Sequence, residues 1–337
     1  MEQKKNRNIV FDLLKLFAIF LVLWGHVIQQ FTILPGVENK TYQIIYSFHM
    51  PLFMMISGYF AVSIIKKGFW EVVWQKVQQL IIPATVGGVV IGLLLVYFES
   101  QFSVLQIPKF LFGCLWFLKS AFICTLFYWI GAKIIPTHQW IGLLVTLLIS
   151  QLINIFSIRF MYPSFLLGVW IRQNYDFFQK YRKSITIVSG FLWLVLVLSF
   201  TSDTYKAQWG GYFVSSTINS ASLVHIYHRF ITGLCGAVFY IGLFEIIFSK
   251  ISSPVVSRAS KIGQYTLGIY ILQSIILETI FSRIIHVRSS ETFFLDMVVA
   301  PLGSIIILIL CLVIVKFVKK YRIGRIMLLG ERIRRPK

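Results

Sequence analysis

Apolar stretches about twenty residues long recur along the whole chain, and they restrict its fold more than any other feature. The stretches 9–31 and 295–318, for example, consist almost entirely of apolar side chains. A helix needs roughly 20 apolar residues to cross the hydrocarbon core of a bilayer. Hydrophobic residues make up 57% of the chain, which exceeds the roughly 45–50% typical of soluble domains. We therefore expect an all-α, polytopic membrane helical bundle without a separate soluble domain.

The apolar stretches predict about ten transmembrane helices. Their expected ranges are 9–31, 41–65, 79–98, 109–132, 139–158, 160–172, 184–200, 224–248, 263–285 and 295–318. The first is too long for the core of a signal peptide and no small-residue cleavage site follows it, so we expect it to be retained. The sixth is short, which indicates a half-helix or a tilted one. We expect residues 1–318 to form one membrane domain and residues 319–337 a basic cytoplasmic tail.

The positions of the basic residues predict the orientation of these helices. If the N-terminus is cytoplasmic, most lysines and arginines fall in cytoplasmic loops and in the tail. This bias obeys the positive-inside rule and predicts that both termini are cytoplasmic. It also accounts for most of the net charge of +20. Because no soluble basic face is present, we expect membrane lipid and no nucleic acid as a partner; a specific phosphate site is the alternative.

Lys15 and His26 are the most informative ionisable residues. They stand eleven positions apart in the first apolar stretch, which corresponds to roughly 16 Å or three helical turns. Both therefore lie on nearly one face, with Lys15 near a membrane surface and His26 deep inside. Asp12 belongs to the same face and is a natural ion partner for Lys15. Ionisable groups at this depth are functional candidates; a packing histidine and a snorkelling lysine are the alternatives.

The second and fourth stretches add further candidates. Pro51 frees the carbonyl four residues before it, so a water-filled cavity beside His49 is one interpretation and a kinked, packed helix is the other. Ser57 precedes Gly58, and this small pair favours close helix approach. Trp116 and Lys119 lie within the fourth stretch, where Lys119 is deep enough to require a cavity or a carboxylate, such as Glu245 or Glu278.

Metal-binding patterns are weak in this chain. The spacing of His225 and His228 could hold a metal ion, but no further ligands are apparent in the sequence. An acceptor-binding site and solvated interfacial side chains are the other interpretations of this pair. All four cysteines fall in apolar stretches without metal-type spacing, and we expect no metal.

Four elements in order resemble the acyltransferase-3 family of integral-membrane bacterial O-acyltransferases. They are Asp12-Leu13-Leu14-Lys15 with His26, the segment from Ser47 to Phe53 with Ser57-Gly58-Tyr59, Leu115-Trp116-Phe117-Leu118, and the weaker segment from Ile262 to Gln273. The resemblance covers nearly the whole chain. It departs from the family at Gln273, where many relatives have histidine, and this puts a catalytic role at that position in doubt.

The resemblance implies an acyl-CoA donor used from the cytoplasm and a hydroxyl of a cell-surface glycan, or of its lipid-linked precursor, as acceptor. The expected location is the cytoplasmic membrane of a bacterium. We expect Lys15, with Asp12, to bind the donor, an acetyl-CoA or another acyl-CoA. His26 would then take the proton from the acceptor hydroxyl, although an acyl-histidine intermediate is an alternative. His49, Ser57, Trp116 and Lys119 would line the chamber, and Lys119 would stabilise the oxyanion.

A transporter or flippase for an anionic or glycan substrate is the rival hypothesis. Intramembrane Lys, His and Glu residues also mark transport pathways, and a proline-broken helix is compatible with transport. The chain shows no repeat symmetry between its halves, which disfavours this hypothesis. A non-catalytic subunit of a glycan-export complex is a third possibility.

Overall fold

The structure is a computed structural model that describes residues 8–33, 36–207, 213–214, 217–218, 220–251, 253–285 and 292–332. Within these residues the protein is helical, apart from a hairpin of two short antiparallel strands in which Phe213 pairs with Ile218 and Val214 with Thr217. The α-helices and strands are α1 (Ile9–Phe31), α2 (Lys40–Ala61), α3 (Phe69–Lys76), α4 (Ile82–Phe98), α5 (Ile107–Gly113), α6 (Trp116–Ile134), α7 (Gln139–Leu152), α8 (Ile158–Gln173), α9 (Tyr175–Leu198), α10 (Ser202–Lys206), β1 (Phe213–Val214), β2 (Thr217–Ile218), α11 (Ser220–Phe248), α12 (Pro254–Ile262), α13 (Thr266–Gln273), α14 (Ser282–Ile284), α15 (Thr292–Phe294), α16 (Ala300–Val318) and α17 (Arg322–Met327).

Short 3-10 and π-helical segments connect or extend these helices. The 3-10 segments are η1 (Gly36–Glu38), η2 (Val62–Lys66), η4 (Val104–Gln106), η5 (Pro136–His138), η6 (Ile155–Ser157) and η7 (Gly263–Tyr265), and the π-helical ones are η3 (Val77–Ile81), η8 (Ser274–Phe281) and η9 (Leu295–Val299). Both kinds of segment continue a helix with a locally altered pitch, and π-helical turns are frequent at functional sites.

Eight helical stretches in the described residues are long and apolar enough to cross a membrane. They are Ile9–Phe31, Lys40–Lys66, Phe69–Phe98, Trp116–Ile134, Tyr175–Leu198, Leu223–Phe248, Pro254–Ile284 and Leu295–Val318. The stretches predicted at 139–158 and 160–172 correspond to α7 and α8, which have 14 and 16 residues. The expectation of a polytopic helical membrane bundle is therefore confirmed, and eight stretches of the described residues reach the length that a full crossing requires.

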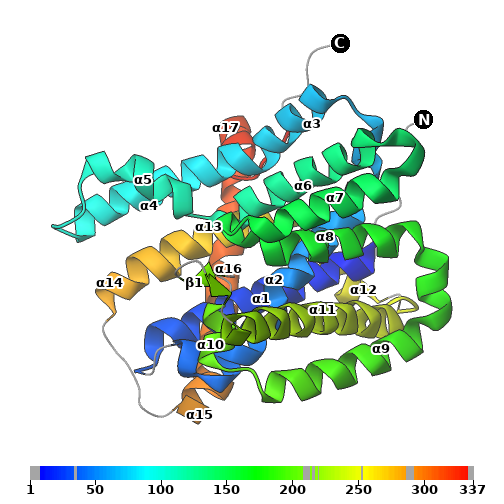
Figure 1. The fold of residues 1–337 in the computed structure, drawn as a ribbon. Coiled ribbons are helices and arrows are strands. Elements are labelled where there is room, and N and C mark those ends of the chain that lie inside the picture. The colour runs from blue at the N-terminus through cyan, green and yellow to red at the C-terminus, as the bar shows by residue number, and fades with distance from the viewer. Residues whose placement is uncertain are drawn as a thin grey trace.

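The helix predicted at 109–132 is wrong, because this stretch is divided in two. α5 ends at Gly113 and α6 begins at Trp116. Leu115, between them, adopts the left-handed conformation with φ 50° and ψ 40°. A single helix cannot pass through such a residue, so the chain turns there. Figure 1 shows α4 and α5 side by side in an arm that extends from the bundle.

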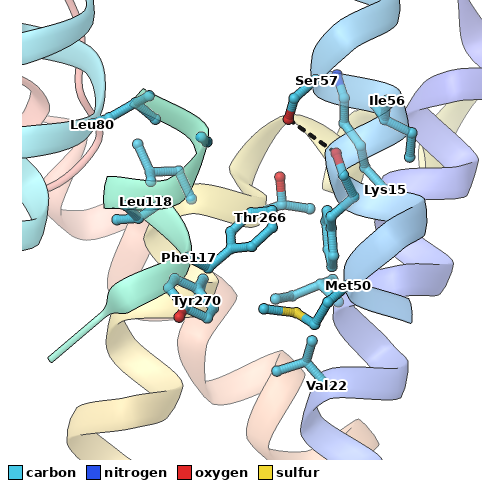
Figure 2. A pocket seen from close by; sticks show the side chains of 14 residues that line it. Lys15, Val22, Met50, Ile56, Ser57, Leu80, Phe117, Leu118, Thr266 and Tyr270 are labelled. Carbon is cyan, nitrogen blue, oxygen red and sulfur yellow. Dashed lines mark hydrogen bonds between the residues drawn. The ribbon is translucent and has the colours of Figure 1, made fainter. Parts of the chain in front are cut away.

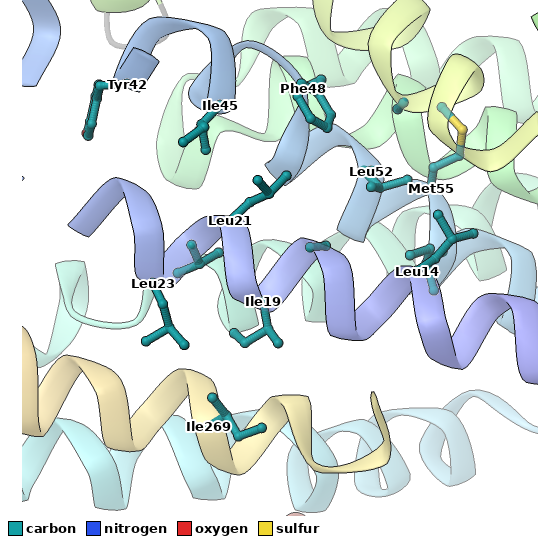
Figure 3. Close-up of a cluster of buried hydrophobic side chains, with 14 of the residues drawn as sticks. Leu14, Ile19, Leu21, Leu23, Tyr42, Ile45, Phe48, Leu52, Met55 and Ile269 are labelled. Atoms are coloured by element: carbon teal, nitrogen blue, oxygen red, sulfur yellow. The ribbon is translucent and has the colours of Figure 1, made fainter. Parts of the chain in front are cut away.

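Helix α1 is the central helix of the bundle. It contacts α2, α11, α12, α13 and α16, and its buried side chains include Leu14, Ile19, Leu21 and Leu23. Figure 3 shows these side chains between those of α2 on one side and Ile269 of α13 on the other. Because other helices surround most of α1, its ionisable side chains Asp12, Lys15 and His26 are buried or only partly exposed.

The start of α1 and the end of α16 lie at one end of the bundle. Gly263, in η7, packs so tightly against α1 that an added Cβ would lie 1.8 Å from the carbonyl oxygen of Asp12. Lys319, directly after α16, donates to the Tyr265 hydroxyl of the same segment η7. At the opposite end, the Trp24 indole donates to the carbonyl of Asp296, just before α16. The first and last long helices are therefore antiparallel.

Glycines set the closest helix crossings. An added Cβ on Gly58 of α2 would lie 1.9 Å from the carbonyl oxygen of Phe165, and one on Gly168 of α8 would lie 1.9 Å from that of Met55. Only two glycines facing each other allow α2 and α8 to approach this closely. The packing role expected for the pair Ser57-Gly58 is confirmed.

Candidate active site

Three cavities lie in series along α1. The first, which we call the vestibule, has a volume of about 650 Å³ and includes Asp12, Lys15, Lys66 and Arg172 in its wall. The second, the channel, is smaller at about 160 Å³ and has Lys15 in its wall. The third, the chamber, has about 720 Å³ and contains His26. Lys15 lines both vestibule and channel, and Tyr270 lines both channel and chamber, so the cavities adjoin one another.

Lys15 stands at the junction of vestibule and channel. Its ammonium nitrogen is 3.2 Å from Oδ1 of Asp12 and 4.6 Å from the centre of the Phe60 ring. The ion pair expected from the i, i+3 spacing is confirmed. Asp12 is only 6% exposed, and the vestibule adds the cations of Lys66 and Arg172 around this single carboxylate. The wall of the vestibule therefore carries a net positive charge.

The channel is mostly apolar. Figure 2 shows Lys15 at one end of it, with Met50, Phe117 and Tyr270 along its wall. Ser57 also lines it, but its hydroxyl donates to the carbonyl of Phe53 at 2.9 Å within the same helix. The wall of the channel therefore offers few polar groups to a bound molecule.

His26 and Glu278 meet in the chamber. Nε2 of His26 lies 3.3 Å from Oε1 of Glu278 and 3.5 Å from the Tyr46 hydroxyl. Gly25 makes room for the Tyr46 ring, because an added Cβ would lie 2.4 Å from the ring atom Cε2. The imidazole of His26 therefore faces the carboxylate of Glu278 at the wall of the chamber.

Two neutral donors hold the carboxylate of Glu278. Gln273 donates through Nε2 at 2.8 Å and Ser274 through its hydroxyl at 2.9 Å, both to Oε1. Glu278 belongs to the π-helical segment η8 (Ser274–Phe281). Gln273, fully buried, thus orients the carboxylate that contacts His26.

The sequence does not reveal this role of Glu278. Glu278 and Glu245 were expected as partners for Lys119, and this expectation is wrong. Glu245 accepts from Tyr175 and Gln179. A carboxylate within an apolar stretch did signal a functional residue, but the partner, His26, lies 252 positions away in the chain.

Of the remaining predicted residues, Trp116 lines the chamber and two others lie outside all three cavities. Lys119 lines none of the three cavities, and its ammonium donates to the carbonyls of Leu111, Phe112 and Cys114. His49 also lies outside their walls: it is 1% exposed and its Nδ1 lies 2.8 Å from the carbonyl oxygen of Ile45. The structure therefore favours the packed helix over the water-filled cavity at His49.

The pair His225 and His228 faces a threonine. Thr204 Oγ1 lies 3.0 Å from Nδ1 of His225 and 3.4 Å from Nδ1 of His228. Nε2 of His228 lies 2.8 Å from the carbonyl oxygen of Leu196. These contacts join α9, α10 and α11 at one end of the bundle, well separated in the chain from the residues of the chamber.

Comparisons with known proteins give one family and two related proteins. Residues 8–316 match the model of an acyltransferase domain. A nodulation protein NolL of Sinorhizobium fredii is 31% identical over 185 residues, which cover 51% of this chain and 50% of that protein. A nodulation protein NolL of Mesorhizobium japonicum is 26% identical over 301 residues, covering 80% of this chain and 76% of that protein. No solved structure matches significantly.

Proposed function

This chain belongs to the acyltransferase-3 family of membrane acyltransferases, and on that premise we propose that it is an O-acyltransferase. It transfers an acetyl or similar short acyl group from acyl-CoA to a hydroxyl of a saccharide. The acceptor is a cell-surface glycan or its lipid-linked precursor. The protein acts in the cytoplasmic membrane of a bacterium, with about ten crossings and both termini cytoplasmic.

The contact between His26 and Glu278 in a chamber that adjoins a smaller channel carries this proposal. The imidazole is a general base, and a carboxylate 3.3 Å away stabilises the imidazolium that proton transfer produces. The chamber provides space for an acceptor, and the channel provides a second approach from the end where Lys15 lies. Two substrates can then meet at His26 without sharing an entrance.

The shapes and charges of the cavities fit the parts of an acyl-CoA. The positively charged vestibule, with Lys15, Lys66 and Arg172, suits the phosphates of the nucleotide end. The apolar channel suits the thin pantetheine arm. From Lys15 to His26 the helix rises roughly 16 Å, a distance that the extended arm spans. Bound in this way, the donor presents its thioester in the chamber.

The transfer itself balances with His26 alone as proton carrier. The acceptor oxygen attacks the thioester carbonyl carbon while its proton passes to the imidazole. The tetrahedral intermediate collapses by breaking the C–S bond, and the imidazolium returns the proton to the thiolate. The products are the O-acylated saccharide and free CoA thiol. An acyl-histidine route would instead form and break an N–acyl bond at His26.

The wall of the chamber suits a saccharide acceptor. Aromatic side chains from Phe102, Phe110 and Trp116 lie there together with polar ones from Gln106 and Arg283. Aromatic rings cover the apolar faces of a sugar ring, while polar groups bind its hydroxyls. Binding sites commonly combine an apolar lining with a few such polar groups.

Release of CoA thiol by the purified protein tests the proposal. Detergent-solubilised protein is given acetyl-CoA and glycan from a host that lacks the protein, and thiol release and the mass of the glycan are measured. We expect both to change with wild-type protein and neither with His26→Ala, while Lys133→Ala, on the exposed surface of α6, behaves as wild type.

Normal turnover by His26→Ala would refute the role of the histidine. Transport in sealed vesicles without thiol release would support the rival transporter, and acid-quenched protein carrying an acyl group on His26 would support the acyl-histidine route.

A further inference from the structure

Lys119 occupies an unusual position at the break between α5 and α6. Its ammonium donates to three backbone carbonyls, those of Leu111, Phe112 and Cys114. The last carbonyls of a helix have no hydrogen-bond partner within the helix. Here Lys119, a side chain of the following helix, donates to them. The same ammonium lies 5.7 Å from the centre of the Phe156 ring. All three of its hydrogens are therefore directed at the backbone of the break.

The break that Lys119 holds is conformationally costly. Leu115 has φ 50°, a left-handed conformation that costs a residue with a Cβ roughly a factor of ten in equilibrium constant. Such conformations persist only where the surrounding structure enforces them, and they concentrate at functional sites. The three carbonyls bound by Lys119 lie on both sides of Gly113, just before Leu115. The lysine thus holds the strained turn in place.

The break also forms the wall where the channel meets the chamber. Gly113, Cys114, Leu115 and Trp116 line the chamber, whereas Phe117 and Leu118 line the channel. The ring of Phe117 stands 6.2 Å from that of Tyr270, the residue common to both cavities. A shift of the turn would move Trp116 and Phe117 together and alter the place where donor and acceptor meet.

We propose that Lys119 is a positioning residue that fixes the turn at Leu115 and thereby the junction of channel and chamber. This inference rests on the proposed acyl transfer, and it replaces the role of Lys119 as oxyanion donor. The two roles make different predictions for a chain whose turn is stable without Lys119. If Lys119 is an oxyanion donor, its loss lowers kcat as much in such a chain as in the wild type. If Lys119 is a positioning residue, its loss lowers kcat less. Glycine at position 115 adopts the left-handed conformation without steric cost.

A double-mutant cycle separates the two roles. We expect Lys119→Met to lower kcat by about 100-fold, since small misplacements near reacting groups have effects of this size, with the KM for acetyl-CoA nearly unchanged. In a Leu115→Gly background the same substitution should lower kcat by only about tenfold, because the turn no longer carries the strain of a left-handed leucine. Lys119→Arg keeps donors for the carbonyls and should retain most of the activity. An equal loss in both backgrounds would overturn the proposal.

The labelling of Cys114 provides a readout that is independent of acyl transfer. Cys114 lines the chamber and is partly exposed, so the rate at which a small maleimide modifies it reports the position of the turn. Mass spectrometry of the labelled peptide distinguishes it from the other cysteines. Because the charge of Lys119 also acts on the Cys114 thiol, the comparison is between two neutral variants. We expect the rate for Lys119→Met to differ several-fold from that for Lys119→Gln, which keeps a donor for the carbonyls, and no change for Lys133→Met on the same helix. Equal rates for the two Lys119 variants would overturn the proposal even in a protein without transferase activity.

If Lys119→Met does not fold, Lys119→Leu, which also lacks donor groups, takes its place in both experiments. If the wild-type protein transfers no acyl group at all, the proposed function fails, and the labelling experiment alone decides whether Lys119 holds the turn.

Discussion

At the scale of single residues, the carboxylate of Glu278 matters as much as the imidazole beside it. One of its oxygens lies 3.3 Å from Nε2 of His26 and accepts from Gln273 and Ser274 as well. Its charge therefore lies where a positive charge would develop on the ring. Neutralising it should weaken His26 as a proton acceptor without changing the shape of the chamber.

We expect Glu278→Gln to lower kcat for acyl transfer by about 100-fold, in the range of effects seen for acid–base groups. Thiol release from acetyl-CoA under saturating donor measures this change. Glu71→Gln is the matched control, because Glu71 is exposed and pairs only with Lys67 among the described ion pairs. Wild-type rates for Glu278→Gln would exclude Glu278 from the reaction.

Gly25 offers a second prediction, through steric effects alone. Any side chain at this position collides with the ring of Tyr46, which lies against His26. We expect Gly25→Val to lower kcat strongly and the melting temperature moderately, since overpacking typically costs about 1–3 kcal/mol. Gly68→Val is the control, because an added Cβ there meets nothing within 4 Å. A fully active Gly25→Val would show that the position of Tyr46 is unimportant.

Some residues of the candidate site could be predicted from the sequence and others could not. Asp12, Lys15 and His26 share one helix, so their spacing predicts a common face, and the structure places Lys15 and His26 at successive cavities along that helix. Glu278 comes from a distant helix, and no local pattern connects it with His26. The position of Lys119 deep in its apolar stretch is visible in the sequence. Its partners are backbone carbonyls, which every residue has, so the sequence cannot show which of them it binds.

At the scale of elements, the crossing of α2 and α8 depends on two facing glycines. We expect Gly58→Leu to separate these helices, because its side chain would overlap the carbonyl of Phe165. The melting temperature in detergent should fall, because overpacking of this kind lowers the free energy of unfolding by about 1–3 kcal/mol. Gly68→Leu should leave it unchanged. An unchanged melting temperature for Gly58→Leu would mean that the crossing is looser than the structure has it.

The bounds of helices were predictable where the length of an apolar stretch determines them. They were not predictable where the backbone turns within such a stretch. Helix α1 agrees with its predicted range, and so do α2 together with η2 and η9 together with α16, whereas α11 begins four residues early. The division of 109–132 into α5 and α6 was missed, because leucine at position 115 is a helix former without a turn signal. Only tertiary contacts, those of Lys119 among them, support the left-handed conformation there.

At the scale of the whole molecule, the order of the cavities predicts how donor fragments behave. Lys66 and Arg172 belong to the vestibule, far from the reacting groups. We expect Arg172→Ala and Lys66→Ala each to raise the KM for acetyl-CoA about tenfold, the scale of one charge-assisted contact, with kcat nearly unchanged. The KM for S-acetyl-pantetheine, which lacks the phosphates, should not change.

Arg258→Ala, on the exposed part of α12, is the matched control for the loss of an arginine. Equal effects on both donors would place the nucleotide elsewhere. No effect on either donor would remove the vestibule from the donor path.

The arrangement of whole helices lay beyond prediction. The lengths and the positive-inside pattern predict a number and an orientation of helices, but not which of them surround α1. The central place of α1 follows from glycine contacts and side-chain shapes distributed over many helices.

The position of Tyr270 between channel and chamber has a final consequence. Tyr270 lines both cavities, and its ring stands 6.2 Å from that of Phe117. On the proposed donor path the thioester passes this pair of rings before it reaches His26. The size of the side chain at position 270 would therefore decide which acyl groups enter the chamber.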